Sequence, residues 1–206
     1  MTLIWLEGIR NLANMTTYPV RTRRWTRAEY DRLIDVGTLR PGDPVELLGG
    51  ELMVAEPQGS RHYVGVCLAE EALRTAFGSG WHVRSQGPVA LDDESEPEPD
   101  IAVVPGTARD YSGGHPARPV LVLEISDSSL GLDRERKGSL YARAGLDDYW
   151  VVNVVERVLE IYRAPVADPS AIYGWRYASR TILGPDASAS PLAAPTAAIV
   201  VHALLP

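Results

Sequence analysis

The chain has 206 residues, of which 45% are apolar and 23% charged, and its formal net charge is −7. This length is enough for one well-packed domain, and the composition excludes disorder as the state of the whole chain. A lone cysteine, Cys67, excludes both an intramolecular disulfide and a cysteine-rich zinc site. No apolar run reaches the ~20 residues of a membrane-spanning helix and no signal peptide is recognisable, so we expect a cytoplasmic protein without a membrane partner.

The first part of the chain divides into an extension and the start of a folded region. Residues 1–21 show no clear period, and we expect them to be a loosely attached N-terminal extension of a single domain over residues 22–206. Thr26 and Glu29 have the spacing of a capping box, which predicts a helix that starts there and ends by Gly37.

Alternating helical and strand patterns follow, and they predict a mixed α/β fold. The expected elements are a hairpin of 45–48 and 51–54, a helix over 60–77, strands near 81–91, 100–104 and 119–125, a helix over 132–144, and strands near 148–154, 157–163, 171–183 and 197–201. The segment 119–125 is almost continuously apolar, which is typical of a central strand buried on both faces. We expect the acidic run 92–98 to be a solvated loop, and the part after residue 164 is rich in Pro and Ala.

A carboxylate in the middle of the expected central strand is the most informative feature. Glu124 would cost several kcal/mol there without a partner, which can be a buried cation or a metal ion. In the helix after this strand, Lys137 shares an apolar face with Leu140, Tyr141 and Ala144, since these residues are spaced i, i+3, i+4 and i+7. We therefore expect Lys137 to face the sheet and pair with Glu124, although a lysine that reaches solvent along an apolar surface remains an alternative.

A second carboxylate, Asp100, opens the strand predicted near 100–104. An Asp after a Pro is commonly part of a turn, so this residue alone indicates little. Together with Glu124 and Lys137, however, it predicts a site for a hard cation, because carboxylate oxygens suit Mg²⁺ or Mn²⁺. A lysine beside such a cation can orient a nucleophile or stabilise a negatively charged transition state.

These residues resemble a known family. The order Pro99-Asp100, Glu124 in an apolar strand, and then a lysine resembles the PD-(D/E)XK nuclease superfamily, and more narrowly the Uma2 family of bacterial, restriction-endonuclease-like proteins. The further supporting residues are Val45-Glu46-Leu47, Gly50-Glu51-Leu52, His62, Glu124 to Ser129, Asp133, Lys137, Tyr141, Ala144-Gly145 and Tyr149 to Val152. The superfamily commonly has its lysine two residues after the Glu, where this chain has Ser126, so the resemblance places that role on Lys137. A common Asp of the first hairpin turn is replaced by Gly49.

The resemblance implies a restriction-endonuclease-like core, with a mixed β-sheet flanked by helices, and a Mg²⁺- or Mn²⁺-dependent endonuclease that hydrolyses DNA. Asp100 and Glu124 would be metal ligands, Lys137 the catalytic lysine and Glu46 a helper. The other interpretations are an exposed carboxylate for Glu46, a capping or surface residue for His62, and an i,i+4 partner of Lys137 for Asp133.

The net charge of −7 opposes tight binding to DNA, since phosphate neutralisation supplies most of the affinity of nucleic-acid-binding proteins. The rival hypothesis is a catalytically silent module with a nuclease fold that binds a partner or assembles. We leave the oligomeric state open, with a homodimer as one arrangement that lets two sites cut two strands.

Overall fold

The structure is a computed structural model, and it describes residues 22–40, 42–55 and 57–206. The expected N-terminal extension, residues 1–21, lies outside these residues. The helices are α1 (Arg27–Asp35), α2 (Ser60–Phe77) and α3 (Gly138–Arg143), with short helical turns η1 (Ala108–Tyr111), η2 (Leu132–Lys137) and η3 (Val201–Leu204). The strands are β1 (Val45–Leu48), β2 (Glu51–Val54), β3 (Trp81–Ser85), β4 (Ile101–Pro105), β5 (Leu121–Ser126), β6 (Asp148–Asn153), β7 (Val158–Ala167), β8 (Trp175–Leu183), β9 (Ser188–Ala189) and β10 (Ile199–Val200).

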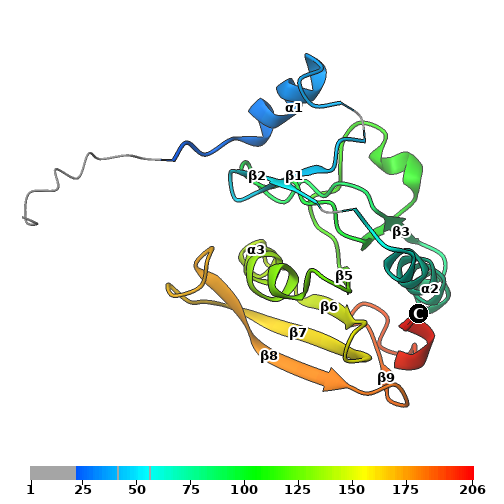
Figure 1. Cartoon of the computed structure of the whole chain (residues 1–206). Helices are drawn as coiled ribbons and strands as arrows, with labels where there is room; N and C mark the ends of the chain where they lie inside the picture. Colours follow the sequence, from blue (N-terminus) through cyan, green and yellow to red (C-terminus); the bar gives the residue numbers. More distant parts are fainter. Residues whose placement is uncertain (1–21, 41, 56) are drawn as a thin grey trace, which may run out of the picture.

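Six of these strands form one mixed sheet in the order β3-β4-β5-β6-β7-β8. Figure 1 shows β6, β7 and β8 of this sheet following one another below α3. The central pair β5 and β6 is parallel, and the other neighbours are antiparallel. The helical segment between β5 and β6 is the crossover that a parallel pair requires. The prediction of an α/β fold with a mixed sheet and flanking helices is therefore confirmed.

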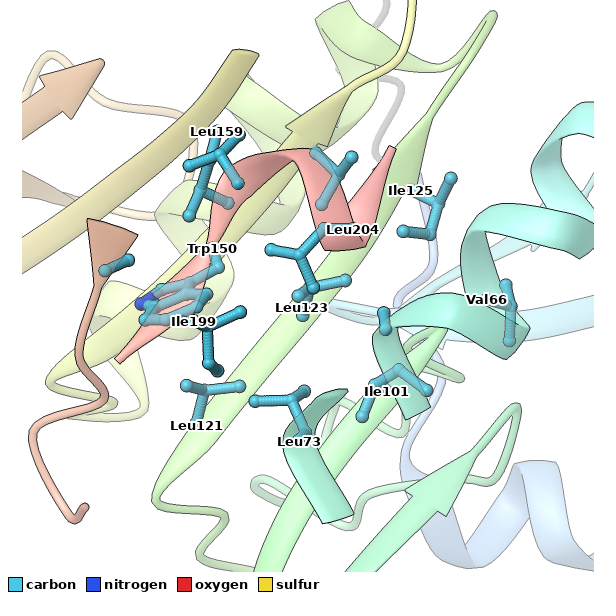
Figure 2. Close-up of a cluster of buried hydrophobic side chains, with 14 of the residues drawn as sticks. Val66, Leu73, Ile101, Leu121, Leu123, Ile125, Trp150, Leu159, Ile199 and Leu204 are labelled. Atoms are coloured by element: carbon cyan, nitrogen blue, oxygen red, sulfur yellow. The ribbon is translucent and has the colours of Figure 1, made fainter. Parts of the chain in front are cut away.

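The two faces of the sheet are covered by different helices. Leu121, Leu123 and Ile125 point to the side of α2 and of the C-terminal turn η3, where they join the larger apolar cluster (Figure 2). Val122 points to the opposite side, toward α3, where it packs in a second cluster. Because side chains alternate along a strand, Glu124 lies on the same side as Val122. All six residues of β5 are buried, as the continuous apolar run predicts.

The hairpin of β1 and β2 lies outside the main sheet, and α1 packs beside it. The hydroxyl of Tyr30 donates to the carbonyl of Val45 at 2.6 Å. The capping box is present, with Thr26 accepting from the amide of Glu29 and Glu29 accepting from the amide of Thr26. The local signals for this helix and this hairpin are thus confirmed.

The acidic run 92–98 is not a fully solvated loop, and that expectation is wrong. The backbone of Glu96 forms a bridge with Leu47 of β1, and the Glu96 residue is only 4% exposed. The run therefore acts as a short extra partner of the hairpin, because the edge of β1 needs backbone hydrogen bonds that the two-stranded hairpin does not supply.

Two expected elements end or bend differently. The strand expected over 81–91 stops at Ser85, because Gln86 has a φ of +48° and Pro88 cannot donate to a ladder. The helix expected over 132–144 begins as the wide turn η2 and becomes regular only in α3. Ala144 is exposed rather than packed on the expected apolar face, since it already ends α3. None of the helices in the described ranges combines the length and apolarity needed to cross a membrane.

A buried ion-pair network ties the turn η2 to β7 and β8. Glu160 is fully buried and accepts hydrogen bonds from Arg134, Arg180, Tyr162 and Asn153. Burial raises the pKa of Glu160, but these donors outweigh it and lower the pKa to about 2. A carboxyl group whose pKa is lowered on folding stabilises the protein above its ordinary pKa.

This network predicts a loss of stability in acid. The contribution of Glu160 should be complete above pH 4.5 and should disappear as the pH falls toward 2, because over this range the unfolded chain binds a proton at Glu160 that the folded state does not. Glu160→Gln should cost up to about 3 kcal/mol at pH 7 and much less at pH 2.5. Urea unfolding at both pH values measures this difference. The exposed Glu135→Gln is the control, and an equal cost of Glu160→Gln at both pH values would contradict the prediction.

Candidate active site

A cavity of about 810 Å³ lies between the β1–β2 hairpin, the start of α2 and the turn η2. Its lining is strongly acidic among the described residues, with one lysine and one histidine, Lys137 and His62. The acidic side chains are Asp43, Glu46, Glu98, Asp100, Glu124, Asp127 and Asp133. This excess of carboxylates favours cations over anions in the cavity, as long as no cation is bound there.

The strand ladder brings Asp100 next to Glu124. The antiparallel pairing of β4 with β5 joins Ile101 to Leu123, so Asp100 stands one step further along, opposite Glu124. The amide of Asp100 donates to Glu124 Oε2 at 3.2 Å, and the amide of Ile125 donates to Asp100 Oδ2 at 2.7 Å. Both carboxyl groups are thus held by backbone donors, and both side chains are buried.

Lys137 reaches the same place from η2. Its Nζ lies 3.1 Å from Glu124 Oε1 and 3.6 Å from Glu46 Oε1, and the Lys137 side chain is only 8% exposed. The prediction that Lys137 faces the sheet and pairs with Glu124 is confirmed. The alternative of a lysine that reaches solvent is wrong, because Lys137 is buried. The alternative of an exposed carboxylate for Glu46 is also wrong, because Glu46 is only 7% exposed.

Lys137 is also the only lysine of the chain, whereas arginine occurs 19 times. An arginine would carry the same charge on a larger, planar group, so the two are not interchangeable where one compact ammonium fits between two carboxylates. The wide turn η2 ends at Lys137, and such π-helical turns occur frequently at functional sites.

The charges of this cluster depend on one another. Burial lowers the pKa of Lys137, but the facing carboxylates of Glu124 and Glu46 outweigh it, and the pKa is raised above its ordinary value. Burial raises the pKa of Glu124 to about 8, although Lys137 opposes this shift. Of the Lys137–Glu124 pair, the ammonium of Lys137 is the group that stays charged, because Glu124 and Glu46 both face it. A permanently charged Lys137 can donate hydrogen bonds but cannot take up a proton.

Three further residues belong to this region, although the sequence did not predict them as metal ligands or catalytic residues. The hydroxyl of Tyr141 donates to Glu124 Oε1 at 2.9 Å, which its place one turn after Lys137 could have indicated. Asp133 is 2% exposed and accepts from Ser129 at 2.5 Å. It forms no ion pair with Lys137, so the expected i,i+4 pair is wrong, because the wide turn η2 directs Lys137 toward β5 instead. Ser126 is buried, and its hydroxyl has no hydrogen-bond partner among the described residues.

His62 approaches Asp100 from the first turn of α2. Its Nε2 lies 3.0 Å from Asp100 Oδ2, and its side chain is 14% exposed. Burial lowers the pKa of His62, but the hydrogen bond and the charge of Asp100 more than compensate and raise it. His62 is therefore part of the site and not the surface or capping residue that a lone histidine usually is.

The donor set fits a hard divalent cation. Asp100 Oδ1 accepts no hydrogen bond from the described residues, and Glu124 contributes a second carboxylate beside it. The part of the chain that the structure describes holds no group of three or more His, Cys, Asp and Glu side chains arranged to bind a metal by themselves. Two carboxylates with water as the remaining ligands is a common way of binding Mg²⁺.

Comparison with known proteins agrees with this architecture. A profile of the Uma2 family, described as "Putative restriction endonuclease", matches residues 27–199. A crystal structure of a "putative nuclease belonging to DUF820" from Anabaena variabilis has a similar fold, with a TM-score of 0.58 and 17% sequence identity over 82% of this chain and 94% of that one. A search of curated proteins found no match. The family match covers most of the chain and includes every residue of the acidic site, and the chain therefore belongs to the Uma2 family, with a nuclease-like fold.

Proposed function

We propose that this protein is a Mg²⁺- or Mn²⁺-dependent endonuclease that hydrolyses DNA phosphodiester bonds. The observation that carries the proposal is the buried contact of Lys137 with Glu124 and Glu46, directly beside Asp100 and open to the cavity. A buried lysine between carboxylates is costly, and replacement by apolar residues often stabilises a protein. Such a cluster is therefore better explained by chemistry than by stability.

Each residue has a distinct part in this proposal. Asp100 Oδ1 and the carboxylate of Glu124 would hold the metal, which when bound supplies positive charge that polarises water and offsets the phosphate. The ammonium of Lys137 would donate to the attacking water or to the phosphate oxygens, where negative charge increases in the transition state. Glu46 would be the second carboxylate that holds Lys137, and Tyr141 would fix the Glu124 carboxylate.

The acidity of the cavity sets how DNA would bind. Phosphate would be repelled by the carboxylates of the lining until a cation is present. Together with the net charge of −7, this predicts weak, nonspecific affinity for DNA that falls further with added salt.

The direct test is cleavage of DNA by the purified chain at low ionic strength. Supercoiled, linear double-stranded and single-stranded DNA should each be tried with Mg²⁺, with Mn²⁺ and with a chelator. We expect nicking or cleavage with metal and none with chelator, and Asp100→Ala should lose both cleavage and metal binding. Metal binding by the wild type without cleavage of any of these substrates would instead favour the binding or assembly module.

A further inference from the structure

Among the described residues, His62 forms one hydrogen bond within the site. It is the third residue of α2, and its Nε2 lies 3.0 Å from Asp100 Oδ2. A carboxylate oxygen only accepts, so Nε2 carries the hydrogen of this contact. The other ring nitrogen, Nδ1, is buried and has no hydrogen-bond partner among the described residues. Within the described part of the chain, Asp100 therefore supplies the hydrogen bond that orients the ring.

The same contact also restricts Asp100. Its Oδ2 accepts from two donors, the amide of Ile125 at 2.7 Å and the ring of His62 at 3.0 Å. These two donors fix the rotation of the carboxyl group and occupy one of its oxygens. Oδ1 accepts no hydrogen bond from the described residues, so it is the oxygen of Asp100 that is free to bind a metal ion.

The packing of α2 makes this contact possible. One turn after His62, Gly65 faces β5, and a Cβ at this position would lie 2.8 Å from Ile125 Cγ2. A larger residue would require α2 or the Ile125 side chain to shift, so the glycine permits the close approach that brings the ring to Asp100. The contact thus results from the packing of a helix that ends far from the site, and no local sequence signal encodes it.

We propose that His62 is a positioning residue, which holds Asp100 in the orientation that binds a divalent cation through Oδ1. The inference rests on the proposed function of the site, since it assigns Asp100 to the metal. A residue that orients a metal-binding carboxylate increases the affinity for the cation, because the carboxylate is then already in place when the cation arrives. Removal of such a residue typically lowers the metal affinity by about 10–100-fold.

Two matched variants separate this role from simple packing. In His62→Gln the side-chain amide reaches the place of Nε2, so a donor to Asp100 can be kept. In His62→Asn the amide takes the place of Nδ1 and is too short to reach Asp100. Mn²⁺ binding to the purified, DNA-free protein should be measured by calorimetry for both variants, with the exposed His202→Asn as the control.

We expect His62→Asn to bind Mn²⁺ at least roughly tenfold more weakly than the wild type, and His62→Gln to lie within a fewfold of it. The rate of DNA cleavage by His62→Asn should recover when Mn²⁺ is raised to saturation, because a positioning role affects occupancy rather than the chemical step. Thermal unfolding without metal shows whether both variants are folded and comparably stable.

The outcomes distinguish the inference from the function on which it rests. If the wild type binds Mn²⁺ and folded His62→Asn binds it equally well, the positioning role is wrong and the metal site stands. A weak His62→Asn whose cleavage stays low at saturating Mn²⁺ also overturns it, since His62 would then act in the chemical step. If the wild type binds no Mn²⁺, the proposed metal site itself fails and the inference fails with it.

Discussion

Lys137→Met is expected to lower the rate of DNA cleavage by about 10²–10³-fold without weakening metal binding. This magnitude is typical for the loss of one donor that stabilises negative charge in a transition state. Methionine keeps the apolar stem and removes only the ammonium. Because that ammonium repels a cation at Glu124, the Mn²⁺ affinity of the variant should equal or exceed that of the wild type.

The neighbouring Arg136→Met is the matched control for Lys137→Met. Arg136 pairs with Glu51 on the hairpin and lies outside the cavity lining, so its loss should leave cleavage within a fewfold of the wild type. Lys137→Arg should also lose most activity, since the planar guanidinium does not fit the place of a compact ammonium. Undiminished cleavage by folded Lys137→Met would keep the enzyme but exclude this lysine from its chemistry.

Mn²⁺ at a hundredfold excess over its dissociation constant is expected to stabilise the wild type by about 2.7 kcal/mol, because the folded state alone binds the ion. For a chain of this size that corresponds to a rise of roughly 5–10 °C in Tm. Asp100→Asn should abolish the rise, since the neutral amide removes one charged ligand. If its oxygen keeps the contacts with His62 and Ile125, its NH2 group takes the place of Oδ1 and cannot bind the ion.

Thermal unfolding with Mn²⁺ and with chelator, followed for the wild type, Asp100→Asn and Asp93→Asn, checks this. Asp93 is exposed and lies outside the cavity lining, so its variant should respond to Mn²⁺ like the wild type. A Tm that responds equally to Mn²⁺ in all three proteins would show that the ion binds elsewhere. A Tm that responds in none of them would contradict the metal site.

Local signals in the sequence were sufficient for most elements of the fold. The capping box at Thr26 and Glu29, the Gly49-Gly50 turn and the period of residues 60–77 each determine a structure within a few neighbouring residues, and each is confirmed. The end of β3 at Ser85 was not predicted, because the apolar pattern continues past the point where the backbone of Gln86 turns.

The sequence by itself also determined that Glu124 needs a partner, because an apolar strand leaves a carboxylate without solvent. Lys137 could be named as that partner, since it shares a helical face with residues of the core. The regular period failed at Asp133, because η2 is a wide turn and a period of 3.6 residues does not describe it. It failed at Ala144 because α3 already ends there.

Only the tertiary structure decided that His62 and Tyr141 contact the site and that Glu46 is buried in it. Glu46 lies on β1, His62 on α2 and Asp100 just before β4. In its own segment His62 looks like a capping or surface residue, whereas Asp100 and Glu46 were assigned to the site only together with other residues and the family resemblance. The three residues meet because β4 pairs with β5 in one register, Gly65 lets α2 approach β5, and the hairpin closes over the cavity. These are contacts between segments far apart in the chain, and their geometry depends on how whole elements pack rather than on any local pattern.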